Sequence, residues 1–323
     1  MGKFMPFHNG HIALTGFALA NTDELVILVC AHTNEIIGGS IRYNWVKDYY
    51  LNNSKVHVHL IEYDDALLYA DSVSSKAAAQ KWANHLKEKF PGTNIFISSE
   101  PYGEYVAEHW GIDHLCFDEK RQRVPVSATE IRQHPFKYWS YIPAVVRPYF
   151  IKKVCIAGSE STGKSVLTER LAGYYKTVFV PEAARDIVTT TAACTIDDLY
   201  TIADVHASAI IETVSHANKL LFADTDITIT KSYAAFLFGI TIVTEDWVNE
   251  ANRFDLYLFL ETDCNYIQDG TRLDEERREK LSRSHKKEFA RQGISYHTIN
   301  GNWEERFHSA IKIIDQEFFE AEI

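Results

Sequence analysis

The chain has 323 residues, of which 46% are apolar and 24% charged, so it has the composition of an ordinary globular protein and a length that favours two domains. Its 33 Lys and Arg residues against 44 Asp and Glu residues give a formal net charge of −11, which argues against a general nucleic-acid-binding protein, because duplex binding relies on clustered basic side chains. No stretch resembles a membrane span or a signal-peptide core, and the scattered cysteines form no CxxC pair, so we predict a cytoplasmic protein with reduced thiols and no nucleic-acid or membrane partner.

Short apolar runs alternate with longer amphipathic stretches in the first half of the chain. The predicted strands are residues 24–31, 56–61, 94–98 and 114–117. The predicted helices between them include residues 41–51 and 76–90, the second of which is followed by Pro91-Gly92. Such alternation is typical of a parallel sheet covered by helices on both faces.

His8 and His11 form an HxGH motif just before a helical pattern over residues 12–21. Two imidazoles at the start of a helix can both hydrogen-bond phosphate and stabilise the charge that develops when the α-phosphate of a nucleotide is attacked. A metal site is not expected here, because no Cys or acidic cluster supplies further ligands at a recognisable spacing.

A second polar motif, SxTxxR, lies near the end of the first half and comprises Ser127, Thr129 and Arg132. Ser127 and Thr129 are placed like N-capping residues of a new helix, which leaves backbone N–H groups for phosphate, and Arg132 follows within that helix. A plain capping box with a surface arginine would give the same pattern. The presence of HxGH at the opposite end of the same half favours a phosphate-binding role.

A domain boundary is expected near residues 142–151, where Pro143 and Pro148 interrupt any helix. It divides the chain into residues 1–146 and 147–323. The strands predicted after it are residues 153–157, 177–180, 219–223, 255–260 and 295–299. We therefore predict an α/β fold with two doubly wound parallel-sheet domains.

A P-loop follows the first of these later strands and fits G-x-x-x-x-G-K-[ST] at every fixed position. In such a loop the backbone N–H groups and the helix N-terminus point at phosphate oxygens, which predicts ATP as co-substrate. Lys164 would reach the β- and γ-phosphates, and the Ser165 hydroxyl would bind Mg²⁺. The predicted phosphate-binding residues are Gly158, Ser159, Glu160, Ser161, Thr162, Gly163, Lys164 and Ser165.

Acidic and basic residues follow the next two strands. Asp224 and Asp226 come after an apolar run, where a carboxylate organises Mg²⁺ in P-loop enzymes. Glu182 and Arg185 would face the acceptor, Glu182 by taking a hydroxyl proton and Arg185 by pairing with an anion. A surface ion pair at i,i+3 spacing is the alternative for these two residues.

The stretch Asp269-Gly270-Thr271-Arg272 leads into a highly charged helical segment. A small kinase with a mobile lid needs an arginine that closes over the phosphates. Arg272 is placed for that catalytic role.

The order of these motifs resembles a known family. HxGH near the start and SxTxxR near the end of a doubly wound domain resemble the nucleotidyltransferase superfamily, whose fold is Rossmann-like. A P-loop kinase directly behind narrows the resemblance to the bifunctional nicotinamide-nucleotide adenylyltransferase/ribosylnicotinamide kinase family, known as NadR-like. The stretch Ser99-Glu100-Pro101-Tyr102-Gly103-Glu104-Tyr105-Val106 makes the match specific, and the likeness covers nearly the full chain.

The resemblance implies two linked reactions of NAD salvage. The second half would phosphorylate nicotinamide riboside with ATP, and the first half would join the resulting mononucleotide to the AMP part of a second ATP, giving NAD and pyrophosphate. Tyr102 and Tyr105 would help to form the nicotinamide pocket, and Glu182, Arg185 and Asp224 would contact the kinase substrate. The residues that would bind the triphosphate in the first half are Lys3, His8, His11, Ser127, Thr129 and Arg132.

Two departures from the family pattern bear on these expectations. The chain starts at Met1-Gly2-Lys3-Phe4, where the fold normally has an apolar first strand, so either a misplaced start or a weakened adenylyltransferase half is expected. Some relatives also carry an N-terminal helix-turn-helix repressor domain. Nothing precedes the adenylyltransferase motif here, so no DNA-binding role is expected.

Three alternatives remain open from the residues. The chain could be a kinase whose N-terminal half only binds or senses nucleotides, or it could use the same chemistries on another vitamin-derived substrate such as a flavin. It could also be a nucleotide-responsive regulator that binds DNA, against which the acidic charge counts. The sequence leaves open whether the chain forms a homo-oligomer.

Overall fold

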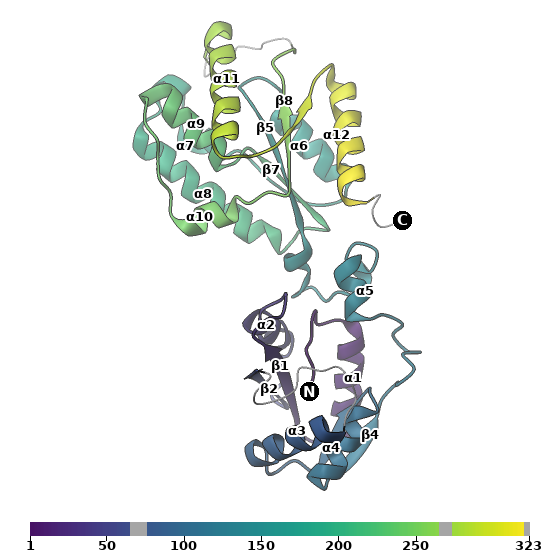
Figure 1. Cartoon of the computed structure of the whole chain (residues 1–323). Helices are drawn as coiled ribbons and strands as arrows, with labels where there is room; N and C mark the ends of the chain where they lie inside the picture. The colour runs from purple at the N-terminus through teal and green to yellow at the C-terminus, as the bar shows by residue number, and fades with distance from the viewer. Residues whose placement is uncertain (65–75, 265–272, 320–323) are drawn as a thin grey trace. The chain divides into compact units, whose positions relative to one another are not determined.

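The computed structural model describes residues 1–64, 76–264 and 273–319 (Figure 1). The chain forms two compact units, unit 1 with residues 1–147 and unit 2 with residues 148–323. A short 3₁₀-helix, η2 (Arg147–Phe150), spans the boundary in sequence. Among the helices of the described ranges, none has both the length and the apolar character that crossing a membrane requires.

The strands of unit 1 form two parallel pairs, β1 (Leu25–His32) with β2 (Val56–Tyr63) and β3 (Ile95–Ser98) with β4 (Asp113–Cys116). Gly2 adds a parallel bridge beside Val29 of β1. Its N–H donates to Leu28 O at 3.0 Å, and its carbonyl accepts from Cys30 N at 2.9 Å. The segment that leads to His8 is therefore fixed against the sheet.

Helices cover the strands of unit 1, and their apolar faces form its core. They are α1 (Asn9–Asn21), α2 (Gly39–Tyr49), α3 (Lys76–Lys89), α4 (Tyr102–Trp110), α5 (Ala128–Gln133) and the 3₁₀-helix η1 (Trp139–Tyr141). α3 buries Trp82 and Leu86 on one face, with small alanines around them, and packs on α4 and on Ile61 of β2. Its lysines are exposed, as the amphipathic pattern predicts.

Unit 2 is built on one parallel sheet in the order β6-β7-β5-β8-β9. Its strands are β5 (Lys152–Gly158), β6 (Phe179–Val180), β7 (Leu220–Asp224), β8 (Leu256–Leu260) and β9 (His297–Ile299). Every residue of β7 and β8 is buried, as expected for a parallel sheet with both faces covered. Because β5 is central, the loop that follows it emerges in the middle of the carboxyl edge of the sheet.

The helices of unit 2 lie on both faces of this sheet, with α6 and α12 on one face and α8, α9 and α11 on the other (Figure 1). They are α6 (Lys164–Tyr174), α7 (Ala184–Ile187), η3 (Thr191–Ala193), α8 (Ile196–Val214), α9 (Ile227–Phe238), α10 (Asp246–Ala251), α11 (Glu275–Arg291) and α12 (Trp303–Phe318). Four of them begin at a side-chain N-cap, which accepts a hydrogen bond from a first-turn N–H: Thr195, Asp226, Asp274 and Asn302.

The predicted fold class is confirmed, since the strands within each sheet are parallel and alternate with helices along the chain. The predicted strand bounds differ from the observed ones mainly at the sheet edges. Residues 177–180 shorten to β6 (Phe179–Val180), and residues 295–299 shorten to β9 (His297–Ile299). Each of these edge strands pairs on one side only within the described sheet, so fewer of its residues meet the criteria for a strand.

Candidate active sites

His8 and His11 open helix α1 of unit 1 and are held by its backbone. His8 is the N-cap residue: its Nδ1 accepts from Gly10 N at 3.0 Å, while His11 Nδ1 accepts from His8 N at 3.2 Å. This reciprocal capping satisfies two N–H groups that lack partners within the helix. A Cβ atom on Gly10 would lie 2.7 Å from His8 Cε1, so glycine is required beside this ring.

The capping bonds also decide which ring nitrogen of each histidine carries the proton. Because Nδ1 accepts in both rings, the neutral imidazoles carry their proton on Nε2, where it can be donated. Burial, with repulsion from Arg121, lowers the pKa of His8 to about 4. Burial, with repulsion from His8 and Arg121, lowers the pKa of His11 well below its usual value. The ring centroids lie 3.9 Å apart, so the pair presents two adjacent neutral donors suited to phosphate oxygens.

The structure brings the SxTxxR motif to the segment that leads into these histidines. Arg132 is half-buried and donates from Nη1 to the carbonyl of Met5 and from Nη2 to Thr129 Oγ1, the latter at 3.0 Å. Ser127 caps α5 in a capping box with Glu130, to which its Oγ donates at 2.7 Å and its N–H at 2.8 Å. The capping box is therefore present, and Arg132 nevertheless reaches the first residues of the chain instead of extending into solvent.

A buried arginine that the sequence analysis did not single out holds the turn at Lys3. Arg42 is 0% exposed and donates to the carbonyls of Lys3 at 2.5 Å and Cys30 at 3.1 Å. It also pairs with Glu35 at 2.5 Å, and Lys3 pairs with the same carboxylate at 3.0 Å. In the sequence, Arg42 is one basic residue in a polar helix start, a pattern typical of exposed arginines as well.

Tyr102 and Tyr105 lie on α4 and pack against the core of unit 1. Burial raises the pKa of Tyr102, and the Lys76 ammonium lies 5.2 Å from the centre of the Tyr105 ring. The pair is therefore placed by core packing, and its role in a nicotinamide pocket stays a prediction.

In unit 2, the carbonyl groups of the loop between β5 and α6 accept hydrogen bonds from surrounding side chains. Ser159 O accepts from Lys164 Nζ at 3.1 Å and from Thr162 Oγ1 at 2.8 Å. Glu160 O accepts from Arg278 Nε at 2.9 Å, and Thr162 O accepts from Arg306 Nη1 at 2.7 Å. Ser161 O accepts from Cys264 Sγ at 3.3 Å. Arg278 and Arg306 are each 1% exposed. Side chains therefore hold the carbonyls of Ser159, Glu160, Ser161 and Thr162, and in a loop of this type the backbone N–H groups are the groups that point at phosphate.

The backbone of this loop adopts left-handed conformations that the surrounding contacts maintain. Ser161 has φ 58° and Gly163 has φ 86°. A Cβ atom on Gly163 would lie 2.0 Å from Trp303 Cζ3, so glycine is needed there for space as well as for conformation. A left-handed conformation costs a residue such as Ser161 about 1–2 kcal/mol, which the hydrogen bonds on either side offset.

The structure joins the predicted kinase residues in one hydrogen-bonded group. Ser165 donates from Oγ to Asp224 Oδ2, and Arg185 Nη2 donates to Ser165 Oγ at 2.6 Å. Arg185 Nε pairs with Glu182 at 3.2 Å, so the i,i+3 pair exists and also reaches Ser165. Lys164 is 8% exposed and is the first residue of α6, next to Ser165. Residues from three separate segments thus meet at the carboxyl edge of the sheet.

Asp224 is 1% exposed, and burial, followed by repulsion from Glu182, raises its pKa to about 6. The charges of Lys164 and Arg185 and the Ser165 hydrogen bond oppose that rise. Asp226 differs from it, because it caps α9 through Ile229 N at 3.2 Å and accepts from Tyr257 Oη at 3.1 Å. The oxygens of Asp226 therefore serve the packing of α9 and β8.

Four buried side-chain atoms of unit 2 have no hydrogen-bond partner among the described residues: Ser159 Oγ, His206 Nε2, Asp224 Oδ1 and His285 Nε2. Burial lowers the pKa of His206 to about 4 against the opposing charge of Glu182, and burial with the Lys164 charge lowers that of His285 to about 3. Buried polar atoms are usually satisfied, so these four atoms are candidates for contact with a polar ligand. Neither histidine stands out in the sequence, because each lies within a helical pattern that also suits a core position.

Arg272 lies outside the described residues, so its predicted role as a phosphate-closing arginine stays a prediction.

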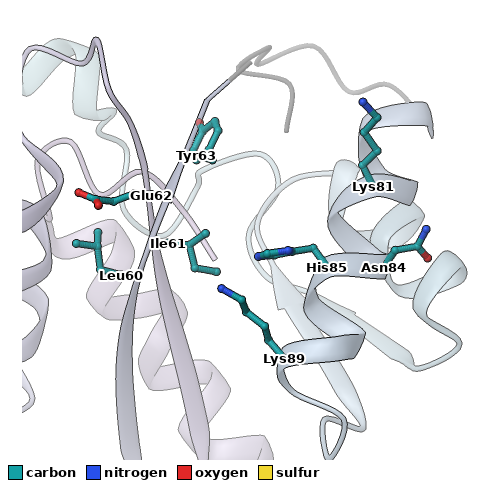
Figure 2. Close-up of a pocket in the computed structure, with 8 residues that line it drawn as sticks. All are labelled: Leu60, Ile61, Glu62, Tyr63, Lys81, Asn84, His85 and Lys89. Atoms are coloured by element: carbon teal, nitrogen blue, oxygen red, sulfur yellow. The ribbon is translucent and has the colours of Figure 1, made fainter. Parts of the chain in front are cut away.

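A cavity of about 370 Å³ lies elsewhere in unit 1, between β2 and α3 (Figure 2). His85 and Lys89 of α3 point toward Ile61 of β2, whereas Leu60 and Glu62 lie on the other side of the strand. The residues that line this cavity include none of the predicted site residues. We therefore place the candidate sites at the motifs and not at this cavity.

Comparison with known proteins gives a consistent assignment. Residues 153–306 match a family model described as an AAA domain. The trifunctional NAD biosynthesis/regulator protein NadR of Escherichia coli is 30% identical over 294 residues, which cover 84% of this chain and 70% of that protein. The protein of the same description from Salmonella typhimurium is 30% identical over 293 residues with the same coverage.

Two solved structures also match nearly the whole chain. A NadR protein in complex with NR has a TM-score of 0.80 at 22% identity, over 98% of this chain and 96% of that one. A NadR protein in complex with NAD and AMP-PNP has a TM-score of 0.78 at 22% identity, over 98% of this chain and 94% of that one. At this identity the structures establish the fold, and the two curated relatives establish the family. The chain belongs to the NadR family.

Proposed function

We propose that this chain is a bifunctional enzyme of NAD biosynthesis. Residues 147–323 act as an ATP-dependent nicotinamide riboside kinase, and residues 1–146 as a nicotinamide-nucleotide adenylyltransferase. The description of the curated relatives as NAD biosynthesis proteins supports this assignment, as do the NR, NAD and AMP-PNP named as ligands of the related structures. The ligands are nicotinamide riboside, nicotinamide mononucleotide, ATP and NAD.

In the kinase reaction, the riboside hydroxyl attacks the γ-phosphate of ATP and ADP leaves. The loop N–H groups and Lys164 hold the phosphates, and Glu182 accepts the hydroxyl proton. Arg185 lies between Glu182 and Ser165, where it can neutralise charge on the transferred phosphoryl group. The catalytic role proposed for Arg272 is to neutralise charge on the same phosphoryl group together with Arg185.

Asp224 and Ser165 fit a Mg²⁺ ion. Asp224 Oδ1 is buried without a hydrogen-bond partner, and its other oxygen accepts from the Ser165 hydroxyl. Magnesium takes oxygen ligands, commonly one or two from protein together with phosphates and water, and this pair supplies one carboxylate and one hydroxyl. Such an ion would neutralise charge on the β- and γ-phosphates. Asp226 fits less well as a ligand because the α9 cap and Tyr257 use its oxygens.

In the adenylyl transfer, a phosphate oxygen of the mononucleotide attacks the α-phosphate of ATP, and pyrophosphate leaves. The Nε2–H groups of His8 and His11 donate to the phosphates, and Arg132 supplies a fixed positive charge. The proposal for Lys3, Ser127 and Thr129 is contact with the same phosphates. Their present contacts with Glu35, Glu130 and Arg132 would be exchanged or shared when ATP binds.

The observation that carries this proposal is that each unit has its own arrangement of groups suited to phosphate. Unit 1 has two neutral imidazoles with donor Nε2–H groups, and unit 2 has a loop with held carbonyls beside Asp224. Product analysis after incubation with ATP, Mg²⁺ and nicotinamide riboside tests it. NAD with pyrophosphate is expected.

The other outcomes identify the alternatives. Mononucleotide without NAD would contradict the adenylyltransferase and leave a kinase with a nucleotide-binding front half. No consumption of the riboside would contradict the substrate, and trials with flavin or pantetheine would follow.

A further inference from the structure

Glu160, a variable position of the P-loop, ties the loop to three other segments of unit 2. Its Oε1 accepts from Thr191 Oγ1 at 2.6 Å and from Tyr233 Oη at 3.2 Å. Its Oε2 accepts from Leu273 N at 2.9 Å. Thr191 lies in η3, Tyr233 on α9, and Leu273 just before α11. One carboxylate therefore connects segments that are far apart in sequence.

The main chain of Glu160 is fixed as well. Its carbonyl accepts from Arg278 Nε at 2.9 Å, and Arg278 is 1% exposed on α11. The next residue, Ser161, has the left-handed φ of 58°. Holding the Glu160 carbonyl fixes the plane of the peptide that joins these two residues, and hence the direction in which the Ser161 N–H points.

We propose that the Glu160 side chain has a positioning role in the kinase: it holds the loop in its phosphate-binding shape through Thr191, Tyr233 and Leu273, and the carboxylate itself does not contact phosphate. The inference rests on the proposed function for its activity readout. A carboxylate suits this role because it only accepts hydrogen bonds and has room for several donors. Burial, with the nearby Glu160 charge, raises the pKa of Tyr233 well above its usual value, so its hydroxyl stays a donor.

A direct role for the Glu160 side chain in phosphate binding is disfavoured by charge and by geometry. A carboxylate next to a triphosphate would repel it. Both carboxylate oxygens already accept from donors outside the loop. The side chain is thus directed to the surrounding helices, while the phosphate is left to the loop N–H groups and Lys164.

The test compares Glu160→Ala with Glu160→Gln in kinase assays at varied ATP. We expect Glu160→Ala to raise the KM for ATP about tenfold with kcat within about threefold, because the loop loses its shape but keeps its catalytic groups. Glu160→Gln keeps the size and one acceptor, so a rise of about threefold is expected. Rescue by the glutamine variant, at an unchanged thermal unfolding temperature, separates positioning from a general loss of fold.

A double-mutant cycle with Tyr233→Phe identifies the partner. Tyr233→Phe alone is expected to raise the KM for ATP about twofold to threefold, and adding it to Glu160→Ala is expected to change little further, since that contact is already lost. Thr191→Val serves as a second arm of the same kind. Additive effects in both arms, or an unchanged KM in Glu160→Ala, would overturn the proposal.

Two controls keep this inference distinct from the proposed function. Adenylyl transfer by unit 1 is assayed in every variant and is expected to be unchanged. Binding of a fluorescent ATP analogue is measured in the wild type, in Glu160→Ala and in Lys164→Ala. The part of the binding signal that is lost in Lys164→Ala is the component due to binding at the loop of unit 2. If the wild type does not phosphorylate the riboside but that component is weaker in Glu160→Ala, the proposed function is contradicted and the positioning role is supported. If the component is the same in the wild type and in Glu160→Ala, the positioning role falls.

Discussion

The phosphate sites proposed for the two units are built in different ways. Unit 1 uses side chains: His8 and His11 accept backbone hydrogen bonds on Nδ1 and so present Nε2–H donors. Unit 2 uses the backbone: Arg278, Arg306 and Lys164 hold the carbonyls of a loop whose N–H groups are proposed to bind the ligand. Neutral donors held in place before a ligand arrives are common to both proposals, so we expect phosphate binding to depend on fixed geometry more than on net positive charge.

The units share one supporting device. Arg42 in unit 1 and Arg306 in unit 2 are almost completely buried, and each joins backbone carbonyls near its site to a carboxylate, Glu35 or Asp263. A guanidinium can do this because it carries five donors in a rigid plane. We therefore expect the loss of a phosphate donor to cost its unit less stability than the loss of the buried arginine.

The largest expected effect is that of Lys164→Ala, which removes the cation proposed to bind the β- and γ-phosphates. We expect riboside phosphorylation to fall about a thousandfold, while adenylyl transfer from added mononucleotide stays at the wild-type rate. Separate assays of the two half-reactions check this. A parallel loss of both activities would show that the two sites are not independent.

His8→Asn separates capping from donation in unit 1. Asparagine is a strong N-cap, so the helix start should remain intact, but the Nε2–H donor is lost. We expect adenylyl transfer to fall about a hundredfold with kinase activity unchanged. His8→Ala is the matched variant: it should show the same loss of activity and in addition lower the free energy of unfolding by about 1 kcal/mol. Wild-type adenylyl transfer in His8→Asn would contradict a donor role.

The arginine pair is tested by Arg42→Lys and Arg306→Lys. A lysine keeps the charge but cannot bond the same set of carbonyls, so each variant should lower the free energy of unfolding of its own unit by about 2–3 kcal/mol. Hydrogen exchange resolved by peptide assigns the loss to a unit. Lys152→Met, which removes a half-exposed ion pair with Asp255, serves as the control and should change stability by less than about 1 kcal/mol.

Much of the fold and the family could be predicted from the sequence, since periodicity and the order of HxGH, SxTxxR and the P-loop carry that information. The curated relatives confirm the family resemblance. The buried polar residues could not be predicted. Arg42, His206 and His285 lie in helical patterns where a surface or core position is equally compatible, and only the tertiary packing decides their partners. The site residues chosen from motifs stay predictions until they are tested.

The smallest expected effect concerns pH and Asp224. Its pKa is raised to about 6 in the folded protein from a usual value near 3.8, so the folded state binds more protons between these values. Stability from this group is therefore fully present below about pH 4 and is lost as the pH rises through about 6. Asparagine does not ionise, so Asp224→Asn should not lose this stability as the pH rises. We expect the variant to stabilise nucleotide-free unit 2 by about 1–2 kcal/mol at pH 7.5, but not at pH 4.

Unfolding of wild type and Asp224→Asn without nucleotide or Mg²⁺, followed by hydrogen exchange in unit 2, measures that difference. The histidines of both units act in the opposite direction: their lowered pKa values make the protein lose stability as the pH falls from about 6.5 to 4, so only the difference between the variants isolates Asp224. Equal stability of the two proteins at pH 7.5 would mean that the ionised Asp224 carboxylate does not destabilise the fold in the absence of a cation. The loss of kinase activity in the more stable variant would place Asp224 in the reaction, where its burial serves the ligand and not the fold.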